Sequence, residues 1–287
     1  DRSVSRGLGD VYKRQDVDYN VDRLIAGFRE ASEKQAAAVV FPELSITGYS
    51  CGDLFFQPRL RQAALEGLRR FTEATEKSGT VAIVGLPFLY GDALYNTAAV
   101  VQAGRVLALV PKTMLPNYRE FYEKRQFTSA RALGTGTREI TVNGAQVPFG
   151  TDIVFHDMSS PFSFGVEICE DLWSVIPPSS TLALHGARAI LNPSAGTELT
   201  GKAAYRRELV KQQSGRCLCA YALSSAGVHE STTDVVFGGH CLIADNGRLA
   251  AESARFLREN FLILADVDFE RLAAGRLSES SFNDNKP

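Results

Sequence analysis

The chain has 287 residues, 45% of them hydrophobic and 22% charged, and its formal net charge at pH 7 is −2. These values are typical of a soluble globular protein, and they give no electrostatic reason to expect nucleic acid or an anionic membrane as a partner. The longest apolar stretches, such as residues 36–41 and 106–110, are far too short to span a membrane. The five cysteines are odd in number and lack the spacing of a disulfide framework, which favours a reducing, cytoplasmic location.

The first fifteen residues differ from the rest of the chain. They read DRSVSRGLGDVYKRQ and show neither the alternation of a strand nor the apolar face of a helix. We interpret residues 1–15 as an atypical leader, either flexible or non-native, and leave them out of the expected fold.

From residue 16 onward the pattern is regular. Val21, Leu24, Ile25 and Phe28 recur at helical spacing and predict a helix over residues 18–34. We expect these further elements in chain order: a strand at 36–41, a helix at 60–71, a strand at 80–88, two strands within 96–112, loops over 113–150, strands at 154–158, 162–171 and 187–196, a helix at 203–213, a strand at 216–226, a hairpin at 240–253 and a strand at 260–268.

Helices that interleave with many short strands, with no Pro/Gly-rich linker between them, favour a single α/β domain. We expect this domain to cover residues 16–276. The polar residues 277–287 are typical of the start of a linker or tail.

Three residues with chemical potential each follow an apolar strand. Glu43 ends the run at 36–41, Lys112 ends VLALV and Cys169 ends FSFGVEI. Active sites of α/β proteins gather where strands end. A carboxylate can take a thiol proton, an ammonium can stabilise an oxyanion, and a thiolate can attack a carbonyl. Each residue alone is more often a packing or solvent-facing group, so the residues by themselves indicate a cysteine hydrolase without establishing that the three side chains meet.

Longer motifs surround all three residues. The segments FPELSITGYSCGDLF, PKTMLPNYREFYEKRQF and GVEICEDLW resemble the three signatures of the nitrilase (carbon–nitrogen hydrolase) superfamily. More narrowly, they resemble the glutaminase domain of glutamine-dependent NAD synthetases. The stretches NPSAGTELTGK and HESTTDVVFGGHCLIADNGRLAAES add to this resemblance, which covers residues 18–280.

The resemblance implies a four-layer α-β-β-α sandwich with two mixed sheets, and it assigns roles to individual residues. Glu43 would be the general base and acid, Lys112 the oxyanion stabiliser and Cys169 the nucleophile. The second glutamate of the superfamily would be Glu123, with Glu120 as the less favoured alternative. The residues implied in substrate binding are Tyr118, Glu170, Ser194 and Lys202.

The resemblance also implies an activity and its partners. The chain would hydrolyse the side-chain amide of glutamine and pass ammonia to a synthetase domain that amidates nicotinic acid adenine dinucleotide. This part would need no metal or organic cofactor, because ATP and Mg belong to the synthetase domain, which we expect beyond residue 287. The full enzyme would be a homo-oligomer. Members of the superfamily open with a central apolar strand where this chain has residues 1–15, so we expect one core strand to be missing.

Two alternatives remain open. One is a stand-alone amidase of the same fold that acts on another small ω-amide or carbamoyl compound. The other is a non-catalytic binding module, although such a module has no chemical reason to keep Glu43, Lys112 and Cys169 together.

Other reactive side chains are interpreted as structural. Cys217 and Cys219 are expected on one buried strand face rather than at a zinc site, because their spacing does not suit zinc. Cys51 is expected to pack in its loop. His229 and His240 follow Cys169 in the chain, but Cys169 lacks the G-x-C-x-G turn of a Cys-His-Glu glutaminase. Arg206 and Arg207 are expected on a solvated helix face, with contact to a partner domain as the less favoured alternative.

Overall fold

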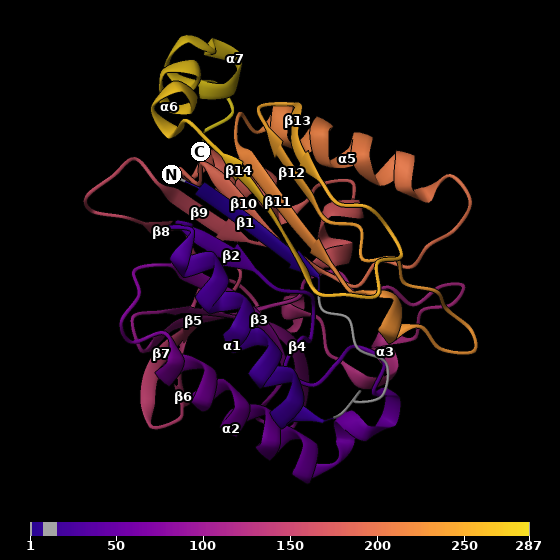
Figure 1. Cartoon of the computed structure of the whole chain (residues 1–287). Coiled ribbons are helices and arrows are strands. Elements are labelled where there is room, and N and C mark those ends of the chain that lie inside the picture. The colour runs from indigo at the N-terminus through magenta and orange to yellow at the C-terminus, as the bar shows by residue number, and fades with distance from the viewer. Residues whose placement is uncertain (1, 8–15, 287) are drawn as a thin grey trace.

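The computed structural model describes residues 2–7 and 16–286. Within this part, two β-sheets lie face to face and helices cover their outer faces (Figure 1). The first sheet has eight strands in the order β14 (Phe261–Asp266), β1 (Arg2–Gly7), β2 (Ala38–Val40), β3 (Val81–Tyr90), β4 (Ala93–Gln102), β5 (Arg105–Pro111), β7 (Ala145–Phe149) and β6 (Arg138–Val142). The second has six, in the order β13 (Arg248–Glu252), β12 (Leu242–Asp245), β11 (Ala220–Ser225), β10 (Ala189–Ser194), β9 (Ser163–Val166) and β8 (Phe155–His156).

Each outer layer of helices covers one sheet. The first sheet carries α1 (Val17–Glu33) and α2 (Pro58–Ala74), and the second carries α4 (Pro178–Leu184) and α5 (Lys202–Arg216). Asp16 caps α1 because its side chain accepts a hydrogen bond from the Tyr19 N–H at 3.0 Å. Pro58 begins α2, where a missing N–H costs nothing. The expected α-β-β-α sandwich with two mixed sheets is confirmed.

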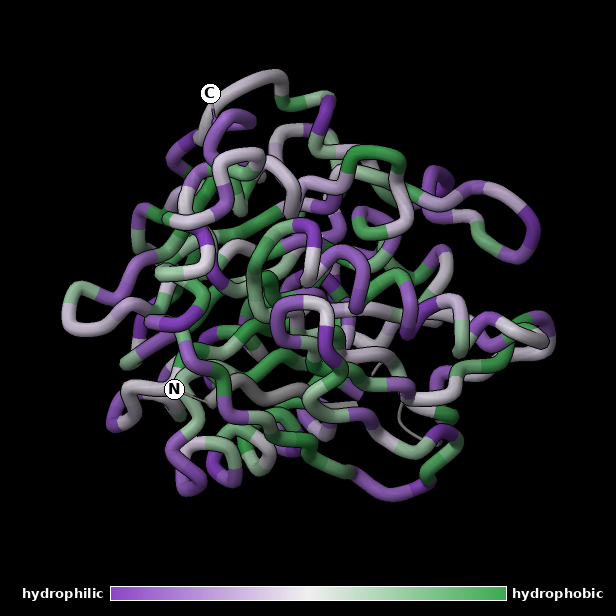
Figure 2. The backbone as a smooth tube through the Cα atoms, turned by 90° about the horizontal axis from the view of Figure 1, so that it is seen from above, coloured by the Kyte–Doolittle hydropathy of each residue, from purple (hydrophilic) through white to green (hydrophobic). Residues whose placement is uncertain are grey.

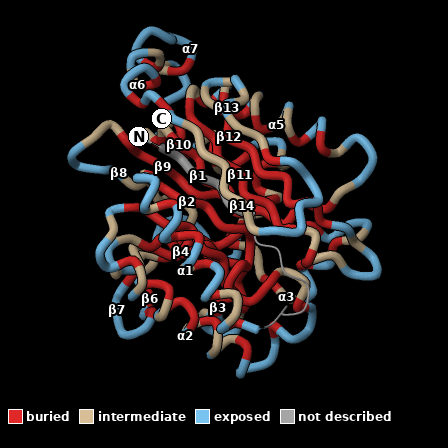
Figure 3. Tube along the Cα trace, viewed as in Figure 1, coloured by how far each residue is buried: buried red, intermediate tan, exposed pale blue. Residues whose placement is uncertain are grey.

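Three apolar layers separate these elements. The strands are buried along most of their length, whereas the helices expose their outer faces (Figure 3). The hydropathy of the chain follows the same arrangement, with apolar segments inside and polar loops outside (Figure 2). Val40, Ile83 and Val100 of the first sheet pack between the sheets with Val166 and Leu191 of the second. The packing of these side chains between the two sheets fixes how the strand ends of one sheet face those of the other.

The opening segment corrects one expectation. Residues 2–7 form β1, which pairs in parallel with β2 (Val4 with Val39) and antiparallel with β14 (Val4 with Leu264). The expectation of no strand there, and of a missing core strand, is therefore wrong. A position between two strands offers unpaired backbone groups on both sides, and this context outweighs weak local propensity. Residues 8–15 lie outside the described part of the chain, and the suggested non-native origin stays a prediction.

Four further expectations need adjustment. The loops of residues 113–150 include the hairpin of β6 and β7, and the polar residues 277–287 include the end of α6 (Phe269–Ser278) and the short α7 (Ser280–Asn283). Cys217 caps α5 and Leu218 has a φ of +46°, so Cys217 and Cys219 are both buried but do not share a strand face. Arg206 is 1% exposed rather than solvated, since it pairs with Glu198 at 2.8 Å.

No helix within residues 2–7 and 16–286 has the length and apolar character needed to cross a membrane.

Candidate active site

The three residues at strand ends come from both sheets. Glu43 follows β2 and Lys112 follows β5 in the eight-stranded sheet. Cys169 follows β9 in the six-stranded sheet and begins the short 3-10 turn η4 (Cys169–Trp173). The Glu43 N–H donates to the carbonyl of Ser194, at the end of β10, at 3.3 Å. The two sheets therefore meet at this site through the ends of their strands.

Lys112 lies between two buried carboxylates. Its Nζ donates to Glu43 Oε1 at 2.6 Å and to Glu123 Oε1 and Oε2 at 2.7 and 2.9 Å. All three side chains are shielded from solvent. Burial alone would lower the pKa of Lys112, but the charges of Glu123 and Glu43 hold it well above its ordinary value. Lys112 is consequently a fixed ammonium, the form needed to stabilise a developing oxyanion.

Glu123 has a different electrostatic state. It begins α3 (Glu123–Gln126), and burial raises its pKa to about 7 although the charge of Lys112 lowers it. Glu120, the alternative second glutamate, instead accepts a hydrogen bond from Thr197 at 2.8 Å and lines a pocket next to Cys169. The geometry therefore brings Glu123 to Lys112, as predicted, and holds Glu120 at the pocket wall.

Two neighbours of these carboxylates were not identified from the sequence. Asn96 Nδ2 donates to Glu43 Oε1 at 2.7 Å, and the Tyr49 hydroxyl donates to Glu123 Oε1 at 2.7 Å. Asn96 is a polar residue at a buried position of the apolar strand β4, and that exception to the pattern could have identified it.

The second oxygen of Glu43 is available for chemistry. Oε2 is buried and has no hydrogen-bond partner within the described residues, whereas Oε1 accepts from both Lys112 and Asn96. Buried oxygens without partners are uncommon and costly, and they often have a catalytic role. Such an oxygen can accept a proton from a neighbouring thiol.

Cys169 is buried next to these charges. Burial, together with the charge of Glu43, raises the pKa of its thiol to about 12, although Lys112 and a hydrogen bond with the Ser194 side chain lower it. The resting group is therefore a thiol, and attack on a carbonyl needs a base.

The backbone at Cys169 adopts an uncommon conformation. Its φ is +45°, in the left-handed region that residues other than glycine rarely occupy. The Cys169 N–H donates to Asn192 Oδ1 at 3.0 Å, and Asn192 Nδ2 donates to the Tyr221 hydroxyl at 2.8 Å. Tyr221 in turn donates to Glu167, so a buried chain of polar groups across β11, β10 and β9 supports the cysteine turn.

A cavity of about 500 Å³ leads to Cys169. Tyr118, Glu170 and Lys202 line it, and the Tyr118 hydroxyl donates to Glu170 Oε1 at 2.7 Å. Lys202 Nζ donates to Thr197 at 2.9 Å. Burial lowers the pKa of Lys202 and raises that of Glu170. An acidic and a basic side chain therefore line the same cavity as the buried thiol.

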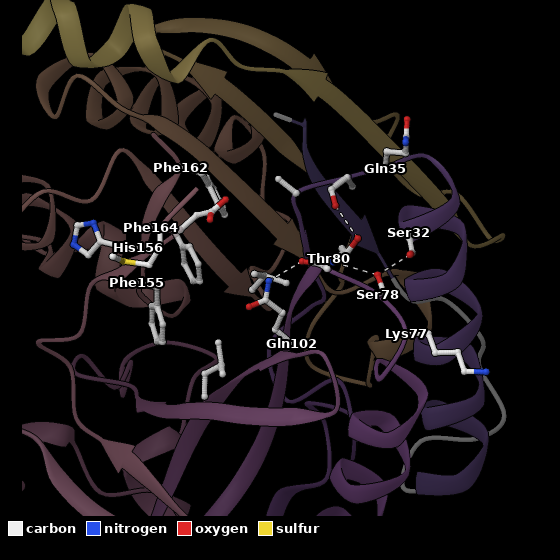
Figure 4. A pocket seen from close by; sticks show the side chains of 17 residues that line it. Ser32, Gln35, Lys77, Ser78, Thr80, Gln102, Phe155, His156, Phe162 and Phe164 are labelled. Carbon is white, nitrogen blue, oxygen red and sulfur yellow. Dashed lines mark hydrogen bonds between the residues drawn. The ribbon is translucent and has the colours of Figure 1, made fainter. Parts of the chain in front are cut away.

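A larger cavity of about 730 Å³ lies at the opposite ends of the strands (Figure 4). Several of its polar side chains are engaged with other groups: Ser32 with Ser78 at 2.7 Å, Thr80 with a carbonyl at 2.8 Å and Gln102 with a carbonyl at 2.7 Å. It holds no thiol, ammonium and carboxylate together. The chemistry of the described residues is therefore concentrated at the Cys169 end.

Metal binding has no evident location in the described part of the chain. No three His, Cys, Asp or Glu side chains gather there in a way that could hold a metal ion.

Comparison with known proteins gives a consistent set of relatives. The carbon–nitrogen hydrolase profile matches residues 5–277. Glutamine-dependent NAD(+) synthetase of Mycobacterium tuberculosis (strain ATCC 25618 / H37Rv) is 42% identical over 260 residues, which are 90% of this chain and 38% of that protein. The Aquifex aeolicus protein of the same name is 30% identical over 276 residues, 94% of this chain and 44% of that protein. The chain thus spans well under half the length of these relatives.

Solved structures agree with these matches. The glutamine-dependent NAD(+) synthetase of Cytophaga hutchinsonii superimposes with a TM-score of 0.82 at 28% identity, covering 92% of this chain and 42% of that one. An amidase from Nesterenkonia sp. has a TM-score of 0.70 at 19% identity, covering 99% of this chain and 95% of that one, which shows a shared fold alone.

Proposed function

The chain belongs to the carbon–nitrogen hydrolase family, and from this premise we propose that it is the glutaminase part of a glutamine-dependent NAD(+) synthetase. The observation that carries the proposal is the buried Glu43–Lys112–Glu123 cluster beside Cys169, which lines a cavity together with Glu170 and Lys202. A relative of that name, 42% identical over 90% of the chain, supports glutamine as the substrate.

The cavity entrance suits an amino-acid substrate. Free glutamine carries an α-ammonium and an α-carboxylate, which match the charges of Glu170 and Lys202. Tyr118 holds Glu170 in place at 2.7 Å, and Ser194 lies against the thiol at the end of β10. The side-chain amide would then extend inward to Cys169.

The first half of the reaction forms a thioester. Glu43, through Oε2, takes the Cys169 proton as sulfur attacks the amide carbonyl. The ammonium of Lys112 stabilises the oxyanion together with a backbone N–H beside Cys169. Because the N–H of Cys169 itself donates to Asn192, the N–H of Glu170 is the donor for this role. Protonated Glu43 then gives its proton to the departing ammonia.

The second half releases glutamate. Glu43 takes a proton from a water molecule that attacks the thioester, and sulfur leaves as the thiol. The sum is glutamine and water converted to glutamate and ammonia, with no redox change. Glu123 holds Lys112 throughout, and this part of the enzyme needs no metal or organic cofactor.

The partners are also proposals. Ammonia would pass to a synthetase domain that uses ATP and Mg to amidate nicotinic acid adenine dinucleotide, in a cytoplasmic homo-oligomer. The relatives of that name are more than twice as long as the part that this chain matches, which leaves room for such a domain.

The test measures ammonia and glutamate released from glutamine by the wild type, Cys169→Ala and Cys241→Ala, with and without an added synthetase domain. Cys241 is the matched control, since it is another buried thiol and directly precedes β12 of the six-stranded sheet. We expect Cys169→Ala to be inactive, and mass spectrometry to detect a glutamyl thioester on wild-type Cys169. Glutamine turnover that survives in Cys169→Ala would overturn the assignment of Cys169 as the nucleophile. Faster cleavage of another ω-amide than of glutamine would favour a stand-alone amidase.

A further inference from the structure

Asp171 is a buried carboxylate two residues after Cys169 in η4. Its oxygens accept three backbone hydrogen bonds. Oδ2 accepts from the Ile168 N–H at 2.9 Å, and Oδ1 accepts from the N–H groups of Thr113 at 3.1 Å and Met114 at 2.6 Å. Burial raises the pKa of Asp171 to about 8, although the hydrogen bonds from the N–H groups of Ile168 and Met114 lower it, because they favour the ionised form.

These donors belong to the two segments that carry the reacting groups. Thr113 and Met114 directly follow Lys112 at the end of β5, in the eight-stranded sheet. Ile168 directly precedes Cys169, beyond β9 in the six-stranded sheet. A single side chain therefore joins the two sheets at the place where the ammonium and the thiol must meet.

The opposite side of Lys112 is already fixed. The Lys112 N–H donates to the carbonyl of Asn96 at 2.8 Å, which holds the residue against β4 within its own sheet. That contact does nothing to place Lys112 relative to Cys169. Asp171 supplies the missing constraint from the other sheet.

We propose that Asp171 is a positioning residue, which fixes the Cys169 turn relative to the end of β5 so that the Lys112 ammonium faces the oxyanion formed on attack. The inference rests on the proposed roles of Cys169 and Lys112. A displacement of about 1 Å between reacting groups costs on the order of 100-fold in rate, so a residue that sets this distance has a large effect without touching substrate.

The test compares two reactions of Cys169, of which only one forms an oxyanion. Acylation by 4-nitrophenyl acetate passes through a tetrahedral oxyanion, forms a C–S bond and expels 4-nitrophenolate. Alkylation by iodoacetamide forms a C–S bond and expels iodide at a saturated carbon, so no oxyanion forms for Lys112 to stabilise, whereas any effect of Lys112 on the pKa of the thiol is common to both reactions and cancels in their ratio. Neither probe depends on glutamine, so the result stands apart from the identity of the natural substrate. Peptide mapping restricts both rates to Cys169, with Cys169→Ala as background.

The variants are Asp171→Asn, Asp171→Ser and the control Ser214→Ala. Ser214 is also fully buried and also ties two backbone segments, donating to the Cys219 carbonyl at 2.7 Å and accepting from the Gly247 N–H at 3.2 Å, but within the six-stranded sheet alone. We expect both Asp171 variants to lower the ratio of acylation to alkylation about 10- to 100-fold, and Ser214→Ala to leave it unchanged.

Other outcomes overturn the proposal. If both rates fall together, the variants have merely distorted the site, and if alkylation accelerates with acylation unchanged, they have merely exposed the thiol. If neither Asp171 variant folds by circular dichroism, Asp171 serves the fold rather than the alignment. If the Asp171 variants lower the ratio as expected but the wild type does not hydrolyse glutamine, the proposed function is contradicted and the role of Asp171 is still supported.

Discussion

Tyr49→Phe removes one hydroxyl and nothing else from the candidate site. The phenol donates to Glu123 Oε1 at 2.7 Å, while the ring packs edge-on against Phe237 with centroids 5.7 Å apart. Phenylalanine keeps that packing. A hydrogen bond to a charged group contributes about 1.5–3 kcal/mol. If all of it serves to hold Lys112 in the transition state, turnover of glutamine falls about 10- to 100-fold.

The same variant changes the pH dependence in a defined direction. The pKa of Glu123 is about 7, and the hydrogen bond from Tyr49 is one of the influences that lower it. Without this bond the pKa of Glu123 rises, so more Glu123 is protonated at neutral pH and Lys112 loses a charged partner. The acidic limb of kcat therefore moves to higher pH.

The assay is glutamate release across the neutral and alkaline range, with Tyr95→Phe as the control. Tyr95 is also buried, and it packs against Phe149 with centroids 5.6 Å apart, away from the carboxylates. We expect Tyr95→Phe to keep the wild-type profile. An acidic limb that does not move in Tyr49→Phe, with turnover within about twofold of wild type, would refute the argument that Glu123 acts through Lys112.

Three other variants test separate parts of the structure. Lys112→Met leaves Glu43 and Glu123 buried without a cation, and Glu123, whose pKa burial already raises, then binds its proton more tightly when folded than when unfolded. Denaturant melts should show a loss of about 3–5 kcal/mol that deepens as pH rises, and equal losses at acidic and alkaline pH would contradict this. Asn192→Leu removes the acceptor of the Cys169 N–H and should lower kcat about tenfold or more, measured by glutamate release, while circular dichroism shows that the fold is retained. Full activity would show that the Cys169 turn does not need this hydrogen bond. Arg206→Met leaves buried Glu198 with Arg255 as its remaining cation, at 3.1 Å, and should destabilise the chain by about 1.5–3 kcal/mol in a urea melt, whereas a solvated arginine would give almost no change.

The sequence predicted those parts of the site that local patterns encode. Apolar runs that stop at Glu43, Lys112 and Cys169 mark strand ends, and strand ends of two facing sheets converge. Periodicity could not find Tyr49 or Asp171, because the partner of Tyr49 is 74 residues away, the partners of Asp171 in the other sheet are 57 and 58 residues away, and polar contacts leave no periodic trace. These contacts exist only once the sheets have stacked.

Two misinterpretations have the same origin. Residues 2–7 lack strand alternation, yet they pair on both sides because β2 and β14 leave a place between them. The charge of Arg206 suggested solvent exposure, yet Glu198 and His240 pair with it in the interior, at 2.8 and 2.9 Å. In both cases a partner distant in the sequence overrides a local preference, as tertiary context commonly does.

The left-handed backbone at Cys169 also has a consequence for laboratory evolution. A residue with a Cβ is disfavoured by about 1–2 kcal/mol in that conformation, and glycine alone escapes this cost. A library screened only for heat resistance would therefore have little reason to keep a side chain at residue 169, and glycine should be among the tolerated replacements. Thermostabilised descendants of this chain should accordingly be sorted for glutamine turnover at every round, because stability alone gives no warning that the proposed nucleophile has been lost.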